Sequence, residues 1–176
     1  MKTLNTLTCV LLFVLVSGFL FPAFAEMKVG ICDTMQVLRE SEEGKRRLEI
    51  YQKLAEKKEA ELDSITQEVN RLQDQLKQLG TSIREDRRTD LERRLEDKVI
   101  EGTRKKKDAE RELALMLDDI QEQMAKLIMP IIQEVGRDQG FSVIFNAQQA
   151  GVLYFDDTVE MTHEVIRRFN ERVKKQ

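Results

Sequence analysis

Apolar residues recur at alternating steps of three and four between positions 48 and 83, and charged or amide residues fill most of the positions between them. A repeat of 3.5 residues keeps one stripe of a helix facing a partner helix over a long distance. The pattern therefore predicts a coiled-coil helix with solvated outer faces. Lys58 is the one polar member of the stripe, whose other members are Leu48, Tyr51, Ala55, Leu62, Ile65, Val69, Leu72, Leu76, Leu79 and Ile83.

The chain is expected to turn back at about residues 80–88. Gly80 favours a helix end because glycine accepts a left-handed backbone, and Ser82 with Glu85 has the spacing of a capping box for a new helix. We therefore predict an antiparallel coiled-coil hairpin over residues 37–127, an arm roughly 60 Å long at about 1.5 Å per residue. The returning stripe is less regular and comprises Leu91, Leu95, Val99, Ala109, Leu113, Met116, Ile120, Met124 and Leu127.

A polar stretch, residues 102–108, interrupts the returning stripe. A turn near residue 82 places this stretch beside the section around Lys58, so both helices weaken the seam at a similar height. Two interpretations stay open. Either these are a few tolerated polar heptad positions, or Lys58 and Gly102 mark a hinge, because loosely packed segments open at low free-energy cost.

The two ends of the chain predict a small β/α body, formed by residues 26–36 and 128–176. Strands are expected at 27–33, 141–145 and 151–155, the last two as a hairpin, and a final helix after Asp156. Pro130 lies in an apolar helical run and is expected to kink that helix where arm meets body. The candidate core residues of the body are Val29, Ile31, Val143, Phe145, Val152 and Tyr154.

This body is too small to bury its strands alone. Its strands and final helix total about 50 residues, near the limit at which a chain sustains its own core. Three short strands do not bury both of their faces, and pooling strands from several copies would solve this. We therefore expect a symmetric oligomer, whose copy number these residues leave open.

The first 25 residues have the order of a secretory signal peptide: Lys2, an apolar stretch, and Ala23-Phe24-Ala25 as a cleavage site after Ala25. The alternative is an uncleaved membrane anchor, since the apolar stretch is just long enough to span a bilayer. Cleavage removes Cys9 and leaves Cys32 as a single thiol, which is either buried or paired between chains.

The residues predict no enzyme chemistry. The sequence has no Gly-rich phosphate loop, no nucleophile–base set and no metal-ligand spacing, and His163 is its single histidine. We therefore predict no catalytic residue, no cofactor and no metal. A net charge of −3 also argues against a protein that coats nucleic acid. A local basic excess near the arm tip (Arg87, Arg88, Arg93 and Arg94) is either a solvated helix face or a contact for another protein or anionic lipid.

Both ends of the mature chain resemble one known family, the Skp (OmpH-like) periplasmic chaperones. The opening segment Lys28 to Asp33 is similar to the family's, as are Glu160-Met161-Thr162 and Val165-Ile166. The match covers the mature chain, with specific ends and a generic coiled-coil middle. The family more often has Asp at the place of Glu160 and Val at the place of Cys32. Further matching positions are Val37, Leu38, Ser41, Gly44, Lys45, Pro130, Ile131, Val135, Gly140, Phe141, Val143 and Tyr154.

The resemblance implies a homotrimer, with strands pooled into a central β-barrel and three helical arms around a cavity. It also implies an ATP-independent periplasmic holdase that binds unfolded outer-membrane proteins and prevents their aggregation. Well-studied members are strongly basic, whereas this chain has an acidic isoelectric point, which argues against lipopolysaccharide or anionic phospholipid as a partner. The rival interpretation is an exported or membrane-anchored coiled-coil stalk or scaffold. A nucleic-acid binder is disfavoured by the same acidic charge.

Overall fold

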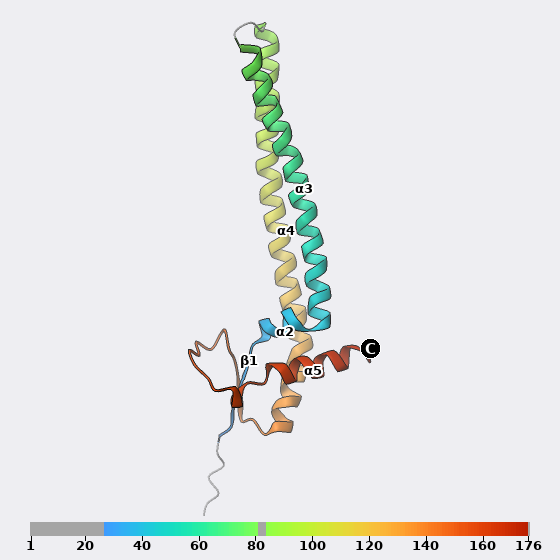
Figure 1. Ribbon diagram of the computed structural model, residues 1–176, viewed down its shortest axis with the longest axis vertical. Coiled ribbons are helices and arrows are strands. Elements are labelled where there is room, and N and C mark those ends of the chain that lie inside the picture. The colour runs from blue at the N-terminus through green and yellow to red at the C-terminus, as the bar shows by residue number, and fades with distance from the viewer. Residues whose placement is uncertain (1–26, 81–83, 176) are drawn as a thin grey trace, which may run out of the picture.

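The computed structural model describes residues 27–80 and 84–175. Figure 1 shows a long two-helix arm standing on a small body, with the body formed by segments from both ends of the chain. The elements are β1 (Val29–Cys32), α2 (Thr34–Glu40), α3 (Glu42–Leu79), α4 (Glu85–Gln139), β2 (Val143–Asn146), the short 3₁₀ helix η2 (Asp157–Val159) and α5 (Thr162–Val173). The predicted class, mainly helical with a small β part, is confirmed.

The arm consists of α3 and the first part of α4, which run antiparallel along a shared apolar seam. Leu72 and Leu91 are buried near the tip, and Ile120 and Met124 are buried near the base. Helix α3 ends at Gly80, whose φ of 50° lies in the region that favours glycine. The predicted capping residue Ser82 lies outside the described residues, and Arg84 precedes α4 without a capping side-chain hydrogen bond.

A tight junction joins α2 to α3 at the base of the arm. Ser41 ends α2 and also caps α3, because its hydroxyl accepts a hydrogen bond from the backbone N–H of Gly44. A Cβ atom at Gly44 would lie 1.9 Å from the backbone oxygen of Leu38. Only glycine therefore allows the two helices to approach this closely.

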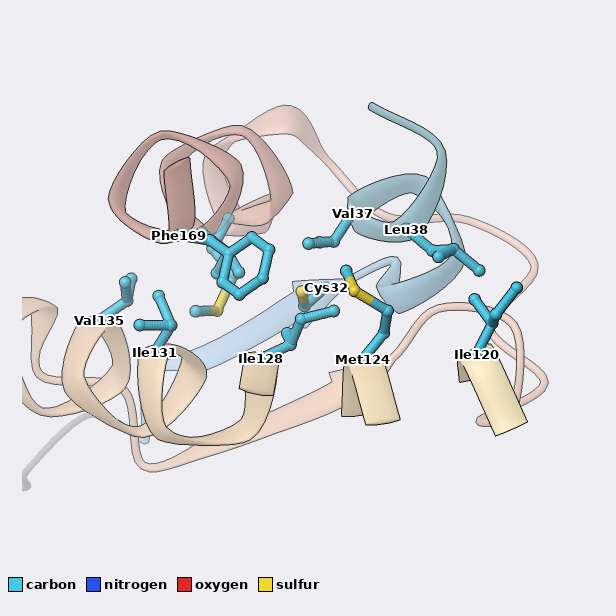
Figure 2. Close-up of a cluster of buried hydrophobic side chains, with 11 residues drawn as sticks. Cys32, Val37, Leu38, Ile120, Met124, Ile128, Ile131, Val135 and Phe169 are labelled. Atoms are coloured by element: carbon cyan, nitrogen blue, oxygen red, sulfur yellow. The ribbon is translucent and has the colours of Figure 1, made fainter. Parts of the chain in front are cut away.

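The core of the body is made by helices. Figure 2 shows Ile120, Met124, Ile128, Ile131 and Val135 in a row along one face of α4, pointing toward α5 and α2. Val37, Leu38, Met161, Val165, Phe169 and Cys32 complete this buried cluster from the other side. Thr162 is also buried, and its hydroxyl accepts a hydrogen bond from the Asp33 N–H at 2.9 Å, which ties the start of α5 to the end of β1.

The sheet differs from the predicted hairpin. Strand β1 pairs parallel with β2, with Val29 opposite Val143 and Cys32 opposite Asn146. On the edge of β1 that faces away from β2, the N–H of Met161 donates a hydrogen bond to the Ile31 carbonyl at 2.9 Å.

The prediction of a third strand at 151–155 is wrong for the single chain. Residues 152–156 have no regular structure, and Leu153 and Tyr154 are 101% and 83% exposed. A strand forms only where another strand's edge is free to bond with it. Both edges of β1 are already bonded, and residues 152–156 do not return to β2.

Helix α4 continues through Pro130 without a break, from Glu85 to Gln139. The sequence predicts a kink at this proline, since it cannot donate a hydrogen bond to the preceding turn. Pro130 itself is exposed. Its neighbours Ile128 and Ile131 are buried and hold the helix against the body.

Candidate binding surfaces

The described residues present several candidate binding surfaces, and the first consists of exposed apolar residues on the body. Leu153 and Tyr154 are almost fully exposed, and Phe145 on β2 is 43% exposed. Large apolar side chains that a single chain leaves exposed often mark a contact with another chain. Of the predicted core residues, only Ile31 is buried in the single chain, while Val29, Val143 and Val152 are half-buried and Phe145 and Tyr154 are exposed.

A carboxylate at the base of the arm connects its two helices. Glu43 on α3 accepts hydrogen bonds from Arg46 at 2.8 and 2.9 Å and from Arg47 at 2.6 Å. These charged hydrogen bonds, that of Arg46 first, hold the pKa of Glu43 below its usual value. Arg47 also donates to the Gln123 side chain on α4, so the network crosses the seam.

A second charged network fixes α5 across α4. Glu164 accepts from Arg167 and Arg168, and this lowers the pKa of its carboxyl group to about 2. Arg168 also pairs with Asp138 and Glu134 on α4. These pairs orient the helix that covers the body core, and Figure 1 shows α5 lying across α4.

Ion pairs cross the seam in the middle of the arm, beside its apolar residues. Within residues 27–80 and 84–175, every ion pair between α3 and α4 falls in this section: Lys58–Glu112 at 2.7 Å, Glu68–Lys98 at 3.3 Å and Glu61–Lys105 at 3.7 Å. The hydrogen bond to Glu112 is the largest cause that raises the pKa of Lys58.

The two hinge candidates do not face each other. Lys58 faces Glu112, whereas a Cβ atom at Gly102 would lie 3.3 Å from Cγ2 of Ile65. Gly102 is therefore a place of close helix approach, and Lys58 is a bridged polar position.

A groove, which we call the mid-arm groove, runs along this section on one face of the arm. Its larger part has a volume of about 680 Å³ and its tipward part about 320 Å³, and the two parts share Leu62, Thr66 and Lys106. The floor is apolar or small: Ala55, Leu62, Ile65, Val69, Val99, Gly102, Ala109 and Leu113. Small side chains at these seam positions leave the space unfilled. Sequence reasoning missed the groove, although Ala55, Gly102 and Ala109 were its signal.

Two of the four arginines of the predicted basic tip form ion pairs with neighbouring acids. Arg88 pairs with Glu92 at 3.0 Å and Arg93 with Asp90 at 3.2 Å. Arg87 and Arg94 have no acidic partner within 4.0 Å among the residues that the structure describes. The four arginines thus do not form one uniformly cationic patch.

Cys32 lies in the core of the body and is free. Burial raises the pKa of its thiol to about 12, so the reactive thiolate does not form near neutral pH. Of the two alternatives, buried or paired between chains, the fold of the single chain has the buried one.

The described part of the chain contains no group of three or more His, Cys, Asp or Glu residues placed to hold a metal ion. Among its helices, none combines the length and the apolar character that crossing a bilayer requires.

The structure defines the chain as a protein with a long antiparallel helical arm on a small α/β body. Comparison with known proteins identifies the family. The family model for outer membrane protein (OmpH-like) matches residues 28–169. The chain therefore belongs to the OmpH-like family, and the resemblance seen at both ends of its sequence is confirmed.

One solved structure shares this fold with a TM-score of 0.69. It is described as a candidate outer membrane chaperone (OmpH-like) from Caulobacter crescentus CB15, and it is 19% identical to this chain. The match covers 85% of this chain and 88% of that one. No curated protein matches the chain.

Proposed function

We propose that this chain is a periplasmic holdase chaperone, which works without ATP and encloses unfolded outer-membrane proteins between the helical arms of a homotrimer. The observation that carries the proposal is the arm itself, which stands clear of the body along most of its length (Figure 1). A solvated rod of that kind offers a long surface for many weak contacts with a client, and such contacts add up to stable capture.

Membership of the OmpH-like family and the description of the Caulobacter structure as an outer membrane chaperone support this function. The exposed apolar residues Phe145, Leu153 and Tyr154 support the oligomer, because three copies around an axis would cover them. In such a trimer, residues 151–155 would find the strand edge that the single chain does not provide.

The function is tested by dilution of a denatured outer-membrane β-barrel protein into buffer with and without the exported protein. Light scattering reports aggregation. Suppression at a ratio of a few trimers per client, with no ATP present, is the expected result. Unchanged scattering at that ratio would exclude a holdase, and bovine serum albumin at equal mass controls for crowding.

The location is tested on the mature protein. N-terminal sequencing of the protein from a periplasmic extract is expected to begin at Glu26, after cleavage behind Ala25. Recovery of the uncleaved chain in the membrane fraction would favour the membrane-anchored stalk instead.

A further inference from the structure

The mid-arm groove has an acidic rim above its apolar floor. Glu56, Glu59 and Asp63 line the groove from α3, and all three are exposed. Their spacing places them on one side of the helix over two turns. Within the described residues none of the three has a basic partner within 4.0 Å, although the arm pairs many of its other carboxylates.

The lysines that line the groove are already occupied. Lys58 pairs with Glu112 at 2.7 Å, Lys98 with Glu68 at 3.3 Å and Lys106 with Glu110 at 4.0 Å. The charge that the groove leaves uncompensated is therefore negative, and it lies along one rim only. Glu56 and Asp63 accept hydrogen bonds only from the neutral side chains of Gln52 and Gln67, so their charge is not balanced. An occupant with cationic side chains on that side would meet carboxylates that have no cationic partner, while an anionic one would be repelled.

The dimensions of the groove limit the form of the occupant. From Ala55 to Val69 the lining covers roughly 21 Å of helix at about 1.5 Å per residue. An extended peptide of about six residues spans this length, since a strand rises about 3.4 Å per residue. In such a peptide alternate side chains point to opposite sides, so one set would contact the floor while the other reaches the rim.

From these observations we infer that the mid-arm groove binds extended client segments in which apolar residues alternate with Lys or Arg. The apolar residues lie on Leu62, Ala109 and Leu113, and the cations lie along Glu56, Glu59 and Asp63. The inference rests on the proposed chaperone function and names the client segments that this arm prefers.

The test uses fluorescein-labelled peptides of about eight residues and the exported protein in its own oligomeric state. One peptide alternates Leu with Lys, a second Leu with Glu, and a third Gln with Lys. Fluorescence anisotropy should show the Leu/Lys peptide binding at least roughly tenfold more tightly than either other peptide, and its affinity should fall as salt is raised. Equal affinity for the Leu/Lys and Leu/Glu peptides overturns the inference, as does Gln/Lys binding as tight as Leu/Lys.

Variants then locate the site. The triple change Glu56→Gln, Glu59→Gln and Asp63→Asn should abolish the preference for Leu/Lys over Leu/Glu. The matched control is Glu96→Gln, Asp97→Asn and Asp118→Asn, which alters net charge equally at exposed arm positions outside the groove. The control should keep the preference. Loss of the preference in both variants would show that it depends on net charge, and would overturn the assignment of the binding site to the mid-arm groove.

Failure of this inference is distinguishable from failure of the holdase function. A protein that suppresses aggregation of a barrel protein but binds the three peptides equally keeps its function without this site. A protein that does not suppress aggregation loses the proposed function whatever the peptides do. Circular dichroism of each variant at 222 nm verifies that the arm is folded.

Discussion

At the scale of single residues, Gly44 is the described glycine at which an added Cβ atom would meet the closest neighbour. The Leu38 backbone oxygen occupies the space that a Cβ atom would need, and backbone atoms do not move aside as a side chain does. The junction between α2 and α3 therefore depends on the absence of one methyl group.

Gly44→Ala is expected to destabilise the protein by about 3 kcal/mol or more, the upper range for overpacking at a rigid site. Urea unfolding followed at 222 nm measures the change. The matched control is Gly102→Ala, whose new Cβ meets only a side-chain methyl of Ile65 at 3.3 Å. That variant should stay within about 1 kcal/mol of the wild type, because alanine's better helix propensity offsets the tight contact. Equal stability of the two variants would contradict the assigned role of Gly44.

The Glu164 carboxyl group makes the stability of the body depend on pH, and the direction of this dependence follows from its pKa. Its pKa in the folded state is about 2, lowered by Arg167 and Arg168, whereas an unfolded glutamate titrates near about 4.3. A depressed folded-state pKa contributes stability above the unfolded pKa, and this contribution is lost as pH falls toward the folded one.

Glu164→Gln should therefore lower the melting temperature at pH 6, and its difference from wild type should shrink between about pH 4.5 and pH 2. Thermal scans at a series of pH values measure this. Glu171→Gln is the control, because Glu171 is exposed and pairs with Arg167 alone. A difference for Glu164→Gln that stays constant down to pH 2 would show that the carboxylate charge plays no part.

At the scale of elements, the arm and the sheet differ in how far the sequence predicts them. A heptad stripe is local, so the positions from Leu48 to Leu79 predict the helix and its packing face without knowledge of the rest of the fold. The partner of β1 is distant in sequence, since both arm helices lie between β1 and β2 along the chain. The segments 141–145 and 151–155 have the local pattern of a hairpin, but in the structure β2 pairs with β1, whose other edge is bonded by Met161.

The side-chain sizes that create the mid-arm groove could be read in the sequence, whereas the groove itself could not. A groove depends on which small residues of one helix meet which small residues of the other. That register became visible only with Lys58 beside Glu112 and Gly102 beside Ile65. The Lys58 and Gly102 hinge stays a prediction, and the ion pairs of this section refine how to test it.

The ion-paired section of the arm should open more readily than the apolar sections on either side. Hydrogen exchange of backbone amides near Lys58 and Gly102 is expected to be faster than near Leu72 and Leu91, and added salt should widen the difference by screening the ion pairs. Mass spectrometry of peptic fragments measures both. Uniform protection along the arm at low and high salt would exclude the hinge.

At the scale of the whole molecule, the exposed residues of the body support the proposal that several copies assemble. Leu153 and Tyr154 expose apolar surface that a soluble monomer rarely leaves uncovered, and they lie in a segment with no strand partner. Tyr154→Asp should convert the proposed trimer to monomers at micromolar concentration, because a buried unpaired charge at the interface is costly. Analytical ultracentrifugation measures the mass. His163→Asp, also exposed but on α5, is the control and should leave the oligomer intact.

The parallel pairing of β1 with β2 also sets the order in which the molecule can be built. A chain that emerges from a membrane channel N-terminus first presents β1 early, but β2 follows only after the whole arm has emerged. Contacts between segments so distant in sequence form late and slowly. The arm hairpin, made of neighbouring segments, can close while the body is still unfinished. Strand β2 and residues 151–155, which we propose to join the copies, would thus become available only after the arm, so each copy could complete its own arm before it could meet another.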